Sequence, residues 1–102
     1  MKEIVGALLQ LAQELENVKK TEPMDEREVV RAIRAAIVAE EGAINQYEVI
    51  VDSSSNEKVK EVLQSVADDE KVHVGELQKL LTLLLDDEQD FLDDGADEVE
   101  GE

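Results

Sequence analysis

The chain has no cysteine and no tryptophan, and only one proline, one phenylalanine and one tyrosine among its 102 residues. Without cysteine it can form neither disulfides nor thiolate metal sites, and it has no cysteine nucleophile. So few aromatic rings exclude the stacking platforms that bind single-stranded nucleic acid. No apolar run approaches the roughly 20 residues that span a bilayer, and the N-terminus lacks the pattern of a signal peptide. We therefore expect a cytoplasmic protein with no membrane partner.

Positive charge is also scarce, since ten Lys and Arg residues oppose 27 Asp and Glu residues, for a net charge of −17. Such a surface repels phosphate backbones, so we expect no nucleic-acid partner. Ten of the acidic residues lie in residues 86–102, which contain no Lys or Arg. With Phe91 and Leu92 as its only bulky apolar residues, this segment is predicted from its composition to be a flexible, disordered acidic tail.

Three stretches carry apolar residues at alternating steps of four and three, the spacing of one helical face. The first predicts an amphipathic helix over residues 1–20, with a stripe of Ile4, Leu8, Leu11, Leu15 and Val18. The second follows Asp25 and Glu28, which resemble a capping box, and its stripe runs over residues 33–51. The third stripe runs over residues 59–84. A polar cluster at residues 53–56 predicts a turn between these two helices, with Ser54 and Glu57 as a second capping box.

A turn of about four residues between two long helices favours an antiparallel hairpin over residues 24–85, with the two stripes facing each other. The predicted fold class is therefore all-α, with an extra N-terminal helix and an acidic tail. A chain of 102 residues has room for one domain. A hairpin of this size buries too little surface alone, which favours association with a second copy.

Three polar residues occupy positions where the stripes require leucine or isoleucine: Glu40 in the second stripe, and Glu70 and His73 in the third. Burying a carboxylate without a partner costs several kcal/mol, and a bound metal would compensate for this cost. Counted from the turn, Glu40 lies about 18 Å and Glu70 about 21 Å along their helices, so we expect them at the same height in the hairpin. Carboxylates combined with an imidazole suit iron, manganese or zinc.

Di-iron helical bundles take a lone Glu from each of two helices and a Glu-x-x-His pair from each of the other two. Glu40 and the pair formed by Glu70 and His73 are half of that set, so two copies would complete a ferritin-like four-helix bundle. A simpler interpretation pairs Glu70 with Lys71 or His73 and leaves no metal. Tyr47, two turns after Glu40, is either ordinary core packing or a group beside the metals. Five acids off the stripes are expected to be solvated charges: Glu41, Glu48, Asp68, Asp69 and Glu76.

The stretches AEEGAINQYE, residues 39–48, and DDEKVHVGE, residues 68–76, resemble the encapsulated ferritins of encapsulin nanocompartments. The likeness covers about residues 27–85. Members of that family are helical hairpins that assemble as ring-like decamers with di-iron ferroxidase centres between subunits. The resemblance implies that Glu40, Glu70 and His73 of two chains hold two irons, with Tyr47 as a further catalytic residue nearby. It also implies storage of oxidised iron inside an encapsulin shell.

The chain departs from that family at Ala39 and Gly42, where the family often has carboxylates. The sequence therefore does not establish an outer site for incoming iron. The acidic tail could target or link the chain to a shell, and the sequence does not separate these roles.

Together these features predict a ferroxidase, an oxidoreductase that converts Fe(II) to Fe(III) with dioxygen or peroxide for iron storage. A rubrerythrin-like peroxidase or a manganese-binding protein could use the same scaffold. A different class is a non-enzymatic helical assembly or adaptor, whose Glu and His side chains pair across a dimer interface.

Overall fold

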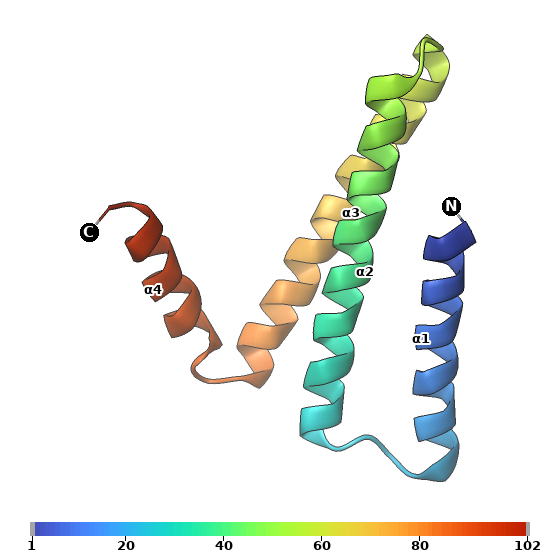
Figure 1. Cartoon of the computed structure of the whole chain (residues 1–102). Helices are drawn as coiled ribbons and strands as arrows, with labels where there is room; N and C mark the ends of the chain where they lie inside the picture. Colours follow the sequence, from blue (N-terminus) through green and yellow to red (C-terminus); the bar gives the residue numbers. More distant parts are fainter. Residues whose placement is uncertain (1, 102) are drawn as a thin grey trace.

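The computed structural model describes residues 2–101, with side chains at 4–15 and 22–101, and this part forms four helices and no strand. The helices are α1 (Lys2–Thr21), α2 (Glu26–Ser53), α3 (Glu57–Leu84) and α4 (Glu88–Val99). Helices α2 and α3 form the antiparallel hairpin, α1 lies beside α2, and α4 projects away from the end of α3 (Figure 1). The all-α class and the hairpin are therefore confirmed. Val18 of the first predicted stripe lies outside the described side chains.

The start of each hairpin helix is fixed by a polar side chain that accepts hydrogen bonds from free backbone N–H groups. Asp25 accepts from the N–H of Glu28 at 2.8 Å before α2. Asn56 accepts from two N–H groups of the first turn of α3, at 3.0 and 3.1 Å. The capping role predicted for Ser54 is therefore wrong, because Ser54 ends α2 and its hydroxyl accepts from the N–H of Asn56 at 3.0 Å. Caps of this kind contribute about 1 kcal/mol each.

The contact between α2 and α3 buries a narrow row of apolar side chains. Its members in the described part of the chain are Ile33, Ile44, Ala67, Val74 and Leu81. The three residues from α3 recur every seven positions, the repeat by which two helices stay in contact along their length. Five buried side chains are a small core for a chain of this length, which favours burial of further surface by association.

The prediction that the two stripes face each other holds only in part, because Leu63, Leu77 and Leu84 of the α3 stripe are half-buried beside this contact while other members of the stripe are exposed. The buried row of α3 lies one residue further along the chain than Val66, His73 and Leu80 of the stripe. Val59 and Leu80, which belong to the stripe, remain 37% and 41% exposed. The stripe therefore lies at the edge of the contact with α2, and its exposed part is left for a second molecule to cover.

Residues 86–102 were predicted to be a flexible tail, and the structure instead forms α4 over Glu88–Val99. Phe91, Leu92 and Val99 recur at helical spacing, and acidic residues in the first turn suit the positive end of the helix dipole. The carboxylate of Glu88 accepts two hydrogen bonds from Arg34 of α2, at 2.8 and 3.3 Å, which ties the base of α4 to the hairpin. Beyond Glu88, the described side chains of α4 are all exposed. None of the described helices combines the length and apolar character needed to cross a membrane.

Candidate metal centre

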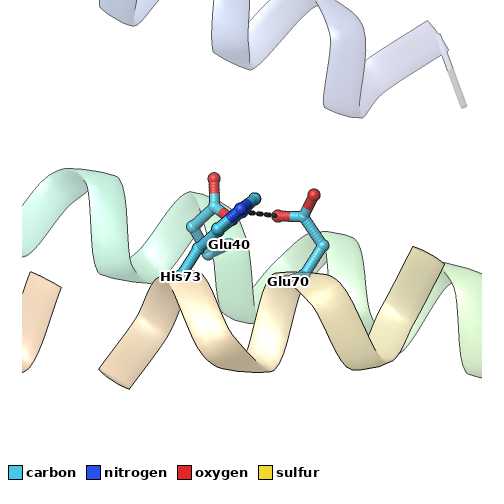
Figure 2. A group of neighbouring side chains, drawn as sticks. All are labelled: Glu40, Glu70 and His73. Carbon is cyan, nitrogen blue, oxygen red and sulfur yellow. Dashed lines mark hydrogen bonds and ion pairs between the residues drawn. The ribbon is translucent and has the colours of Figure 1, made fainter. Parts of the chain in front are cut away.

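The three polar residues of the stripes meet on one side of the hairpin (Figure 2). Glu40 comes from the middle of α2, and Glu70 and His73 come from successive turns of α3. Each offers one ligand atom, and these atoms all lie within 4.8 Å of one another. Among the described residues, these three form the one cluster of acidic and histidine side chains close enough together to hold a metal ion. The matching heights expected from the distances to the turn are therefore observed.

The histidine ring lies between the two carboxylates. Its Nδ1 is 3.3 Å from Oε2 of Glu40 and 3.7 Å from Oε2 of Glu70. The side chains of Glu40 and Glu70 are 28% and 21% exposed, whereas that of His73 is 53% exposed. A single chain therefore supplies two carboxylates and an imidazole from one direction and leaves the other side of the cluster open.

Two carboxyl groups and an imidazole this close together shift one another's proton affinity. The pKa of Glu40 is raised, first because its carboxyl shares a hydrogen bond with Glu70, and then by partial burial and the charge of Glu70. The pKa of His73 is raised by its hydrogen bond to Glu40 and by the negative charges of both carboxylates, against a smaller opposing effect of desolvation. Without metal the cluster therefore holds protons more tightly than free side chains do, and a metal must displace them.

The donor set fits a transition-metal ion. Carboxylate oxygens with imidazole nitrogen suit iron, manganese and zinc, and a Glu-x-x-His pair beside a Glu from a neighbouring helix is half the ligand set of di-iron bundles. Because three protein ligands approach from one side only, two such clusters facing each other would supply six. These residues could hold a metal pair between two copies of the chain.

Lys71 is engaged elsewhere, which removes it as a partner for Glu70. Its Nζ lies 2.7 Å from Glu48 and 3.5 Å from Asp68, and Gln64 donates to both carboxylates, at 3.4 and 3.0 Å respectively. The pKa of Glu48 is lowered mainly by its hydrogen bond with Lys71. Two of the acids predicted to be solvated thus belong to an exposed ion-pair network.

Tyr47 lies on α2, half-buried, two turns beyond Glu40 or about 10 Å along the helix axis. A role beside the metals stays a prediction.

Comparisons with known proteins agree with the fold. The family model for Rubrerythrin matches residues 5–81 and also residues 31–100. A ferritin-like–encapsulin shell fusion protein of Pyrococcus furiosus is 43% identical over 72 residues, which are 71% of this chain and 21% of that protein. The encapsulin nanocompartment cargo protein EncC of Myxococcus xanthus is 41% identical over 61 residues, or 60% of this chain and 47% of that protein. This chain thus spans about a fifth and about half of the lengths of these two relatives.

A solved structure gives the same result in three dimensions. The crystal structure of the encapsulated ferritin domain from Pyrococcus furiosus aligns with a TM-score of 0.76 at 39% sequence identity, covering 78% of this chain and 81% of that one. Since the match extends over most of both chains, the resemblance seen in residues 39–48 and 68–76 is confirmed at the level of the family. The chain belongs to the rubrerythrin-like ferritins and, within them, to the encapsulated ferritins.

Proposed function

We propose that the chain is a ferroxidase whose substrate, Fe(II), is oxidised at a di-iron site shared by two copies. The observation that carries this proposal is the half-set of ligands, Glu40, Glu70 and His73, gathered within 4.8 Å on the open side of the hairpin. Two copies facing each other across that side would form the four-helix bundle and bring six ligands to two irons. The exposed stripe beside the cluster supports this pairing, because it gives the second copy an apolar surface to cover.

Each ligand has a definable task. Glu40 and Glu70 would each supply a carboxylate and His73 an imidazole to hold the irons, with Glu70 lying beside both of the other ligands. His73 must be neutral and Glu40 ionised for this, so iron binding releases the protons that their raised pKa values retain. The chain thereby supplies geometry and negative charge, and the irons supply the electrons.

The reaction balances with dioxygen as the oxidant. Two Fe(II) ions give up two electrons and become Fe(III), while dioxygen accepts both electrons and two protons and becomes hydrogen peroxide. With peroxide as the oxidant, the same two electrons and two protons break the O–O bond and give two waters. Holding both irons in one site matters because each iron provides one electron and the oxidant takes two.

The relatives suggest where this reaction takes place. One is named as a fusion to an encapsulin shell and another as a cargo protein of an encapsulin nanocompartment. We therefore propose that this chain works with an encapsulin shell protein, as a homo-oligomer inside the compartment, where the ferric product is stored. A ring-like decamer is the assembly implied by the family resemblance.

The test is an anaerobic Fe(II) titration followed by native mass spectrometry, and then by admission of air with an optical record of ferric iron. We expect two irons per pair of chains and rapid oxidation, with both lost in Glu70→Ala. Glu76→Ala is the matched control, because Glu76 is an exposed glutamate six residues further along the same helix. A Glu70→Ala chain that bound and oxidised iron like the parent would refute the assignment.

Membership of the rubrerythrin family supports a second candidate on the same ligands, a peroxidase that reduces hydrogen peroxide. The two functions separate by oxidant. A ferroxidase is driven by dioxygen and accumulates ferric iron, whereas a peroxidase turns over peroxide repeatedly with an external reductant and bound, unreleased iron. Manganese or zinc in the site of the purified protein would instead indicate a metal-binding role on this scaffold.

A further inference from the structure

Helix α1 carries the longest uncharged segment of an otherwise heavily charged chain. Residues 4–13 contain no Asp, Glu, Lys or Arg, although such residues make up 36% of the whole sequence. Three large apolar side chains of this segment are exposed: Val5 at 48%, Leu8 at 42% and Leu9 at 65%. An exposed apolar row in a protein of this charge indicates a surface that another molecule covers.

Two residues of the row, Val5 and Leu9, take no part in lining the contact of α1 with its own hairpin. That contact is made by a different side of the helix, on which Ile4, Ala7, Leu8 and Leu11 line an apolar cleft of about 270 Å³. Across the cleft lie the small or exposed residues Ala35, Val38, Ala39 and Gly42 of α2. Leu8 belongs to both surfaces, while Val5 and Leu9 face away from the cleft and remain free.

The position of α1 relative to the metal centre gives the row a specific neighbour. Glu40, Glu70 and His73 extend from the hairpin toward the side on which α1 lies, and α1 is separated from them in the view of Figure 2. A second copy that completes the metal centre must approach the same side. A helix flanking that approach would contact the incoming copy.

We infer that α1 is an arm that packs its exposed row, Val5, Leu8 and Leu9, against the hairpin of the second copy at the shared metal centre. The inference rests on the proposed pairing across the open side of the hairpin. Charge supports a second copy as the occupant, since two chains of −17 repel each other and associate most easily where charge is absent. The uncharged segment of α1 lies against α2 and would enlarge the surface that two copies share.

The arm also gives the site a wall. His73 is 53% exposed in a single chain, and its ring must be neutral and shielded to bind iron. An apolar helix lying across the junction of the two copies limits the access of water to the cluster from that edge. Its absence or displacement would therefore weaken both the pairing and the retention of iron.

The first test measures self-association in the presence of chelator, so that metal binding plays no part. Leu9→Glu places a negative charge in the row, and because a symmetric pair contains two copies of the change, we expect the dissociation constant to rise by roughly tenfold or more. Val49→Glu is the control, as Val49 is a similarly exposed residue of α2, at 59%. Equal association of the two variants would overturn the inference, provided that circular dichroism shows equal helix content.

A second experiment identifies the neighbour of the arm without introducing a charged residue. The chain has no cysteine, so Leu9→Cys gives a single attachment point for a short photo-crosslinker. Mixing ¹⁵N-labelled and unlabelled chains distinguishes links between copies from links within one copy. We expect mixed-isotope products that join residue 9 to α2 or α3 of the other chain, and links confined to one isotope would overturn the inference.

The two proposals fail separately. If the parent binds two irons per pair but residue 9 links only within its own chain, the shared site stands and the arm does not. If residue 9 links between copies but no iron binds, the arm stands and the ferroxidase does not.

Discussion

Leu80 and Leu81 are adjacent on α3, yet the structure assigns them to different interfaces. Leu81 is 2% exposed in the contact between α2 and α3, whereas Leu80 is 41% exposed on the open stripe. Replacing each in turn by alanine should therefore affect two different quantities. Leu81→Ala should lower the stability of the hairpin itself, and Leu80→Ala should weaken the association of two chains.

The magnitudes follow from burial. Removing a buried leucine side chain costs about 2–5 kcal/mol, so Leu81→Ala should destabilise the hairpin by about 3 kcal/mol. Complete burial of an exposed leucine is worth about 1.5–3 kcal/mol. Leu80 has 41% of its surface left to bury, so pairing gains about 1 kcal/mol for each copy. A symmetric pair loses this twice in Leu80→Ala, which raises the dissociation constant by about 30-fold.

Two assays separate the effects. Sedimentation equilibrium with chelator gives the dissociation constant, and urea unfolding of dilute, dissociated protein gives the stability of the hairpin. The reasoning would be refuted if Leu80→Ala left the dissociation constant within about twofold of the parent, or if it destabilised the dilute protein as much as Leu81→Ala.

Four further predictions concern the metal centre and α4. Because the pKa of His73 is raised, its ring begins to take up a proton above pH 6.5. Iron affinity, measured by calorimetry, should therefore weaken as the pH falls toward 6.5, and protonation of Glu40 should weaken it further at lower pH. Constant affinity from pH 8 to 6 would contradict this. Without metal, the contribution of His73 to folding stability changes with pH in the opposite direction. Protonated His73 stabilises the fold below pH 6.5, and this contribution is lost as the pH rises through its raised pKa. Arg34→Ala should lower the free energy of unfolding by less than about 1 kcal/mol, because the pair with Glu88 is partly exposed. Amide hydrogen exchange in α4 should nevertheless become faster, and an unchanged exchange rate would mean that the pair does not anchor α4. Tyr47→Phe should keep the iron stoichiometry and slow oxidation, and an equal rate would assign the ring to packing alone.

The sequence predicted the hairpin and the cluster because both depend on spacing along single helices. Steps of four and three place Glu70 and His73 on one face of α3, and distances from the turn place Glu40 at the same height. These relations fix the heights of the three residues, and the residues meet because the part of the α3 stripe that contains Glu70 borders the contact with α2. The prediction that they form one cluster therefore survived an error in which residues pack inside the hairpin.

That error has a physical cause. Helix α3 has two apolar columns one residue apart, one containing Leu80 and the other Leu81, and periodicity alone does not say which column faces α2. The column with larger residues was assigned to the hairpin, but Ala67, fully buried, permits the close approach of α2 that the other column requires. The larger column is left for a partner that a single sequence does not display.

Helix α4 was missed for a different reason. Its acidic composition indicated disorder, while the contact that ties its base to the hairpin comes from Arg34, which lies 54 residues away from Glu88 in the sequence. Long-range ion pairs of this kind leave no periodic signal. The helical spacing of Phe91, Leu92 and Val99 was the signal that could have identified α4.

The central claim is that two chains form one di-iron site, and counting iron by native mass spectrometry after anaerobic Fe(II) addition tests it most directly. The account predicts that iron appears on paired chains, two ions for each pair, and disappears with Glu70→Ala but not with Glu76→Ala. Iron bound to single chains, or pairs of chains without stoichiometric iron at neutral pH, would contradict it.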